Sequence, residues 1–162
     1  MSSDIISAIA SRAEFRDAVR TCLGGAADAG AREIVMIDPT FADWPLNEVP
    51  VVETFGRWAG AGRSLTVIAH RFDELPRRHV RFVEWRRNWS HVVRCRADAE
   101  LEEQQIPTLL LVPGLTCLRL VDNVNYRGTV SGQAADLMIG RETVDALLQR
   151  SSDAFPVTAL GL

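Results

Sequence analysis

Short apolar runs alternate with amphipathic segments over the first 100 residues, and this alternation constrains the fold more than any other feature. The runs EIVMID (33–38) and SLTVIA (64–69) are continuous, which predicts strands buried on both faces of a sheet. Between them, Val51, Phe55 and Trp58 recur at helical spacing just after a proline. Strands and helices in this order predict an α/β fold with parallel strands.

A helix is predicted before the first of these strands. Ser11 and Glu14 have the spacing of a capping box, and Gly30 suits the end of the helix. The apolar face of this helix comprises Phe15, Val19, Cys22, Leu23 and Ala26. Residues 1–10 are expected to form a flexible lead-in, and residues 11–162 a single α/β domain, because this length suits one hydrophobic core.

The second half of the chain is richer in strands. Three further strands are predicted at HVVRCRA (91–97), TLLLV (108–112) and CLRLV (117–121), a sixth at ADLMI (135–139), and a final helix over 141–150. The expected fold is therefore a single mixed sheet of about six strands flanked by helices.

Composition excludes several classes of protein. A net charge of −3 and a pI of about 5.6 argue against a surface built entirely for nucleic acid. The three cysteines are far apart and form no CxxC, so neither a disulfide framework nor a structural zinc site is expected. The N-terminus lacks the pattern of a signal peptide, and no apolar run reaches the ~20 residues of a membrane span. A cytoplasmic protein without a cofactor or membrane contact is the resulting expectation.

The segment RRHVRFVEWRRNWSH (77–91) is rich in arginine and aromatic residues. Phe82, Trp85 and Trp89 lie on one arc of a helix, which favours a surface helix with its aromatic side turned inward. The alternative is a surface for nucleic acid or a phosphate ligand, formed by Arg77, Arg78, Arg81, Arg86 and Arg87. The tryptophan spacing suits burial better than stacking on bases, so nucleic acid is the less favoured partner.

The sequence contains no GxGxxG, P-loop, GxSxG or HExxH motif. Asp38 and Asp43 follow the first buried strand and are candidates for holding Mg²⁺, although a loop turn explains them better. His70 ends the second buried strand, where site residues of α/β sheets often occur. No metal site is predicted from these residues.

The stretch LTCLRLVDNVNYRGT (115–129), together with the order of elements, resembles the phospholipase D-like superfamily. The nearest likeness is to a small bacterial domain of unknown function, related to phospholipase D and sometimes fused to acetyltransferases. The resemblance covers residues from about 12 to the C-terminus. It implies the phospholipase D-like fold, and it also implies a homodimer, because members with a single motif pair around a two-fold axis.

Active members of that superfamily carry HxKxxxxD, in which the His is the nucleophile and the Lys binds phosphate. Aligning the Asp with Asp122 places Leu115 and Cys117 at the His and Lys positions. Aligning the Lys with Arg119 instead makes Cys117 the nucleophile and replaces the Asp with Val124. Neither alignment restores the motif, so the resemblance implies a degenerate site without phosphodiesterase chemistry.

Polar residues near the degenerate motif are the candidates for a remaining pocket, with a polar turn as the alternative. The pocket candidates are Cys117, Arg119, Asp122, Asn123 and His70, with Asn125, Tyr126 and Arg127 nearby. The resulting prediction is a non-catalytic binding or regulatory module that acts as a homodimer and has an anionic ligand as a candidate partner. The alternatives are nucleic-acid or phosphate binding through residues 77–89, and a phosphodiesterase-like enzyme with an altered site. The apolar segment 155–162 is expected to pack against protein.

Overall fold

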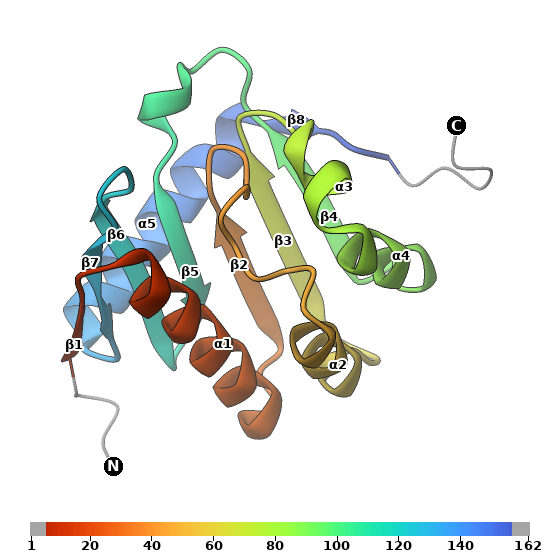
Figure 1. Cartoon of the computed structure of the whole chain (residues 1–162), viewed down its shortest axis with the longest axis horizontal. Helices are drawn as coiled ribbons and strands as arrows, with labels where there is room; N and C mark the ends of the chain where they lie inside the picture. Colours follow the sequence, from red (N-terminus) through yellow and green to blue (C-terminus); the bar gives the residue numbers. More distant parts are fainter. Residues whose placement is uncertain (1–5, 157–162) are drawn as a thin grey trace.

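The computed structural model describes residues 6–156, which form one eight-stranded mixed sheet (Figure 1). The strands are β1 (Ile6–Ile9), β2 (Glu33–Ile37), β3 (Ser64–Ala69), β4 (Val93–Ala97), β5 (Thr108–Val112), β6 (Thr116–Asp122), β7 (Arg127–Ser131) and β8 (Ser152–Asp153). Their order across the sheet is β1-β7-β6-β5-β2-β3-β4-β8. Strands β2, β3 and β4 are parallel neighbours, and the remaining pairs are antiparallel.

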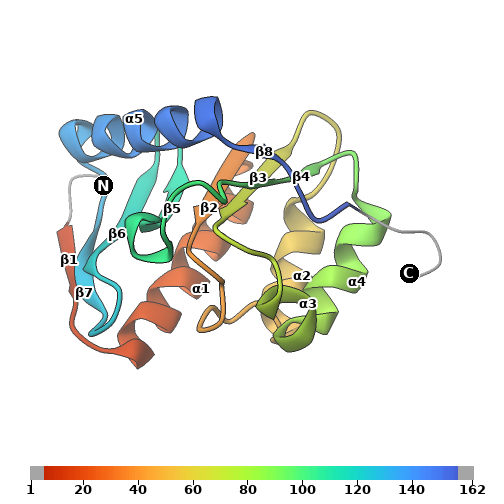
Figure 2. The ribbon, with the colours of Figure 1, turned by 90° about the horizontal axis from the view of Figure 1, so that it is seen from above.

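Helices cover both faces of the sheet (Figure 2). On one face lie α1 (Arg12–Ala29), α2 (Val49–Trp58), α3 (Glu74–Arg78) and α4 (Val80–Asn88), and on the other lies α5 (Ala134–Arg150). A short 3₁₀ turn, η1 (Glu103–Gln105), precedes β5. Neighbouring residues of β2 divide between the two faces: Ile34 and Met36 join the larger apolar cluster with α1 and α2, while Val35 and Ile37 join the smaller cluster with α5. Burial on both faces explains why the run is continuously apolar.

The predicted ends of α1 are confirmed. The Glu14 N–H donates to Ser11 Oγ at 3.1 Å, and the Ala10 N–H donates to Glu14 Oε1 at 2.9 Å, so two backbone donors at the helix start are satisfied. Gly30 ends the helix in the left-handed conformation with φ 63°, which glycine adopts without steric cost. The five apolar residues predicted to face the core are the buried residues of α1.

The α/β class and the single mixed sheet are as predicted, but the sheet has eight strands rather than about six. Residues 6–9, assigned to a lead-in, form β1 and pair with β7. Residues 135–139 were predicted as a strand but belong to α5, where Met138 is 63% exposed and Ile139 40%. The run is apolar although part of it lies on the exposed side of a helix. A short apolar run therefore did not distinguish a buried strand from a helix here.

The arginine-rich segment forms two short helices, α3 and α4, separated at His79. Phe82 and Trp85 are buried and Trp89 is partly buried against the same core, so the predicted inward arc is confirmed. Phe155 stacks on Phe72 with ring centroids 5.5 Å apart. The rest of the C-terminal segment, from residue 157, lies outside the described residues.

Candidate functional site

A polar pocket of about 190 Å³, called here the strand-end pocket, lies where β2 ends, and its walls come from segments far apart in the sequence. Asp38 directly follows β2, and Thr108 begins β5, the antiparallel neighbour of β2. Asn123 and Tyr126 come from the connection between β6 and β7 at the same edge. The carboxyl end of parallel strands is the usual position for a ligand site in open α/β sheets.

Asp38 is held by donors on both carboxylate oxygens. Its Oδ2 accepts the backbone N–H groups of Thr40 at 3.1 Å and Phe41 at 2.8 Å, and its Oδ1 accepts the Thr108 hydroxyl at 2.5 Å. The Asn123 side-chain amide donates in turn to Thr108 Oγ1 at 3.2 Å. Burial raises the pKa of Asp38, and the hydrogen bonds from Thr108, Phe41 and Thr40 lower it only in part. Asp38 therefore anchors the loop after β2 and forms one wall of the pocket.

Asp43 forms a second acidic wall. Its Oδ1 pairs with Arg12 Nη2 at 3.0 Å, and its Oδ2 accepts the hydroxyl of Tyr126. Tyr126 has a positive φ of 58°. Burial and the neighbouring Asp43 carboxylate raise the pKa of Tyr126 to about 12, so its hydroxyl stays protonated and donates.

The charge of the pocket restricts its ligands. Three carboxylates, those of Asp38, Asp43 and Glu103, line it, and its lining includes no basic side chain. Arg12 neutralises Asp43 from outside the pocket. A phosphate placed here would meet negative groups without a cationic partner, whereas a ligand with N–H or O–H donors or a positive charge would find acceptors.

A second cavity of about 330 Å³ shares the lining residue Trp44 with the strand-end pocket. Its basic residues are Arg12, Arg16, Arg78 and His79. His79 is only 4% exposed, and its Nε2–H donates to the Phe41 carbonyl at 2.7 Å. Burial lowers the pKa of His79, and the nearby Arg16 and Arg78 lower it further.

Acidic partners already neutralise the arginines of this second cavity. Glu48 accepts two hydrogen bonds from Arg20 at 2.8 and 2.7 Å and lies 3.7 Å from Arg16. Arg78 donates to Glu74 at 2.7 Å. The cavity is thus polar but has little unpaired positive charge.

The structure separates the residues of the degenerate motif. Cys117 is 3% exposed and faces α5. Asp122 lies at the opposite end of β6, roughly 16 Å away at the rise of a strand. Its Oδ1 accepts the N–H groups of Val124 at 2.9 Å and Asn125 at 3.1 Å, and hydrogen bonds from Asn125 and Val124 lower the pKa of Asp122. The Asp122 side chain therefore accepts the backbone N–H groups of a turn, as the polar-turn interpretation expects.

Two further pocket candidates, Arg119 and His70, do not line the strand-end pocket, whereas Asn123 does. His70 lies beside the pocket loop, because its N–H donates to the Pro39 carbonyl at 3.0 Å. Thr108 was missed by sequence reasoning. Its only sequence signal was its position at the start of a strand.

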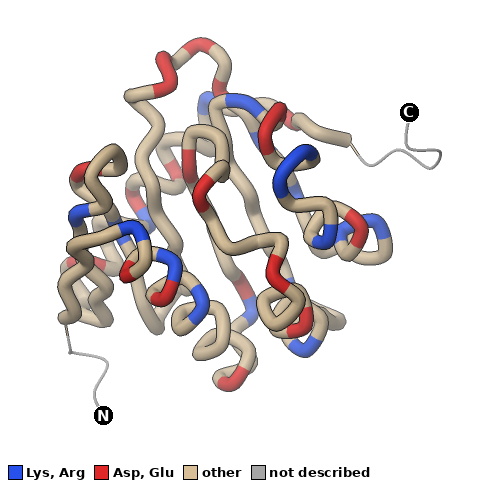
Figure 3. Tube along the Cα trace, in the orientation of Figure 1, with Lys and Arg blue, Asp and Glu red and all other residues tan. Residues whose placement is uncertain are grey.

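The five candidate arginines of residues 77–87 differ in their exposure and in their partners. Arg77 and Arg78 pair with Glu74, and Arg81 donates to the Asn47 carbonyl at 3.1 Å. Arg86 is buried at 6% exposure, whereas the other four arginines are exposed. Basic and acidic positions are interspersed along α3 and α4 in Figure 3.

Within residues 6–156, no helix combines the length and apolar character needed to cross a membrane. The same residues contain no group of three or more His, Cys, Asp or Glu side chains placed to hold a metal ion. The carboxylates of Asp38 and Asp43, considered for Mg²⁺, are instead engaged with protein donors.

Comparison with solved structures identifies the fold as phospholipase D-like, although no protein-family model and no curated protein sequence matches the chain. Nuc from Salmonella typhimurium, a phospholipase D family member, superposes with a TM-score of 0.58 at 11% identity, covering 94% of this chain and 99% of Nuc. TrmBL2, an archaeal chromatin protein with a novel mode of DNA binding, superposes with a TM-score of 0.65 at 11% identity. That match covers 95% of this chain and 55% of TrmBL2, so the chain spans about half of that protein.

Proposed function

We propose that this chain is a ligand-binding or regulatory module that has lost phosphodiester chemistry and acts as a homodimer. The charge of the strand-end pocket is the observation that carries the proposal. Phosphoryl transfer requires cationic groups around the phosphate oxygens, and the lining supplies Asp38, Asp43 and Glu103 instead. The hydroxyl groups of Thr108 and Tyr126 are already oriented by their hydrogen bonds to Asp38 and Asp43. Polar groups that are oriented before a ligand arrives suit the binding of a small polar ligand.

Hydrolysis of bis(p-nitrophenyl) phosphate tests the loss of chemistry. The purified chain should release p-nitrophenolate no faster than buffer between pH 5 and pH 9, with a phospholipase D family nuclease as the positive control. A rate that Asp122→Ala or Cys117→Ala abolishes would contradict the proposal and favour an enzyme with an altered site.

The homodimer is supported by apolar side chains beside the pocket. Val121, near the end of β6, and Val124, in the turn between β6 and β7, are each 78% exposed, and Val124 also lines the pocket. A partner placed over this hairpin would cover both valines and close the pocket. Light scattering after gel filtration should give twice the chain mass. Val124→Asp should give a monomer, whereas Val80→Asp, at a valine 48% exposed on α4, should remain a dimer.

Nucleic-acid binding is a second candidate, favoured by the likeness to TrmBL2. The residues that would carry it are Arg77, Arg81 and Arg87. A labelled duplex titrated at low salt should bind, and should release as salt rises. Loss of binding in the triple alanine variant would support this candidate, while a wild-type chain that fails to bind at low salt would remove it.

A further inference from the structure

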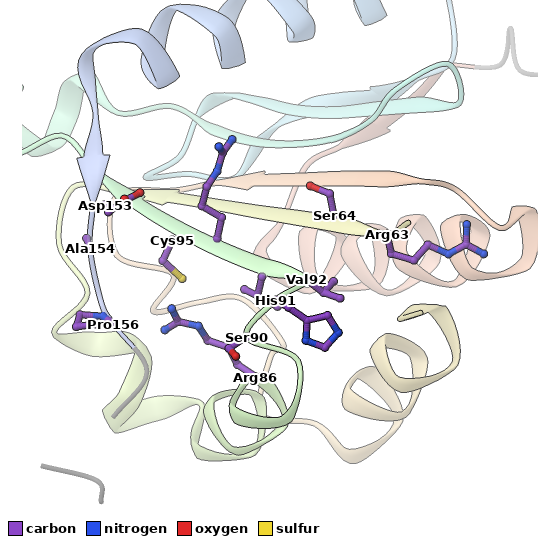
Figure 4. A pocket seen from close by; sticks show the side chains of 12 residues that line it. Arg63, Ser64, Arg86, Ser90, His91, Val92, Cys95, Asp153, Ala154 and Pro156 are labelled. Carbon is purple, nitrogen blue, oxygen red and sulfur yellow. The ribbon is translucent and has the colours of Figure 1, made fainter. Parts of the chain in front are cut away.

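A groove of about 660 Å³ runs along the outer side of β4 (Figure 4). It shares no lining residue with the strand-end pocket. β3 pairs with β4 along its whole length, but β8 pairs with it only at Arg96 and Ala97. The start of β4 therefore borders the groove, whose other walls come from the end of α4 and the segment after β8. The volume lies within the roughly 300–1,000 Å³ of small-molecule sites.

Arg86 is the unusual residue of this groove. Its side chain is 6% exposed, its Nη1 donates to the Phe155 carbonyl at 2.5 Å, and its Cζ lies 4.8 Å from the Phe155 ring centroid. Its Nε is buried and has no hydrogen-bond partner within residues 6–156. Figure 4 shows the guanidinium directed toward Cys95 and Pro156 inside the groove.

No described carboxylate balances this buried charge. Asp153, the acidic residue of the groove, pairs with Arg96 Nη1 at 2.8 Å. The Phe155 ring and carbonyl and the C-terminal end of α4 offer partial negative charge but not a full one. Buried guanidinium groups are usually paired, because removal from water is costly without a counter-charge.

The surroundings of Arg86 define the kind of anion. Ser90 and His91 provide polar side chains at the rim, and the exposed Pro156 provides apolar surface, whereas Val92 and Val93 line the groove but are only 5% and 4% exposed. Arg63 also lines the groove, but it donates to the carbonyls of Trp58 and Gly30 and points away from Arg86 in Figure 4. The groove thus combines one deep cation with an apolar wall.

We propose that this groove binds an organic oxyanion, in which a phosphate or carboxylate pairs with Arg86 and an apolar part lies against Pro156. The guanidinium offers a fork of N–H donors that matches either group. The site is separate from the strand-end pocket, so it does not depend on the function proposed for that pocket.

Isothermal titration of the full chain at constant ionic strength tests this site. Phenyl phosphate and benzoate are the probes for the two oxyanions, inorganic phosphate tests the apolar wall, and benzyl alcohol is the uncharged control. We expect phenyl phosphate, benzoate or both to bind, more tightly than inorganic phosphate, and benzyl alcohol to give no measurable heat. The oxyanion that binds better identifies the ligand class. Failure of both to bind more tightly than about 10 mM would overturn the proposal.

Variants assign the binding to Arg86. Arg86→Gln should weaken binding at least tenfold, while Arg57→Gln, an exposed arginine on α2, should change it less than twofold. If Arg86→Gln does not fold, variants of the exposed rim residue Ser90 test the binding site instead. Ser90→Glu should weaken binding at least tenfold by repulsion, and Ser90→Gln should not. Equal affinities for these two variants, or an Arg86→Gln protein that binds like the wild type, would refute the assignment.

Discussion

Replacing Thr108 with valine tests the network that shapes the strand-end pocket. Thr108 is 1% exposed and donates its hydroxyl to Asp38 Oδ1 at 2.5 Å. Valine keeps the shape but removes the donor. A hydrogen bond to a charged group contributes about 1.5–3 kcal/mol, and the lower end applies because the Asp38 carboxylate is not fully enclosed. We therefore expect the free energy of unfolding to fall by about 1.5 kcal/mol at a pH above the raised pKa of Asp38, measured by urea denaturation.

The dependence on Asp38 and on pH makes this prediction specific. The hydrogen bond that Thr108→Val removes stabilises the charged form of Asp38. The decrease in the free energy of unfolding should therefore be largest above the raised pKa of Asp38 and become smaller as pH falls through that pKa. Thr108→Ser, which keeps a hydroxyl, should cost less. In an Asp38→Asn background, Thr108→Val should cost at least 0.5 kcal/mol less, roughly the smallest coupling a double-mutant cycle resolves. An equal cost in both backgrounds would show that the hydroxyl does not act through Asp38.

Other consequences of the packing are open to the same denaturation assay. A Cβ on Gly140 would lie 2.9 Å from Cys117 Sγ, so Gly140→Ala should destabilise by about 1–3 kcal/mol through overpacking, and an unchanged midpoint would contradict the close approach of α5. Gly56 in α2 has open space for a Cβ, so Gly56→Ala should instead stabilise by about 0.5–1 kcal/mol, and a loss would indicate an unrecognised contact. His79 has a lowered folded pKa, so its contribution to stability is present above the unfolded pKa of about 6.5 and is lost as pH falls through the folded pKa. His79→Gln should therefore flatten the loss of stability between pH 7.5 and pH 5, whereas a parallel pH profile would assign that loss to other groups.

Local signals predicted α1 and the buried strands well, because each depends on residues close in sequence. The hydroxyl of Ser11, the apolar spacing and the left-handed Gly30 all act within one helix. Strands β1 and β7 carried no such signal. Both strands are short and mostly exposed on at least one side. β7 forms a hairpin with β6, and its other edge pairs with β1, which is far away in sequence.

The candidate site was harder to predict for the same reason. The sequence singled out Asp38, Asp43 and Tyr126, but it indicated neither the pairing of Tyr126 with Asp43 nor Thr108 as the partner of Asp38. Thr108 lies 70 residues from Asp38, and Tyr126 lies 83 residues from Asp43. These pairs meet because β5 inserts between β6 and β2, and that strand order is set by the packing of the whole sheet.

The same strand order explains why restoring motif residues at positions 115 and 117 should not restore phosphodiesterase activity. Leu115 lies in the turn between β5 and β6, at the opposite end of β6 from the pocket. A lysine at Cys117 would enter the apolar cluster under α5, where burial disfavours its charge. Leu115→His combined with Cys117→Lys should therefore lose stability and gain no hydrolysis of bis(p-nitrophenyl) phosphate. Hydrolysis by this variant above the buffer rate would show that the site of phosphodiester chemistry lies at that end of β6, and not where Asp38, Thr108 and Tyr126 converge.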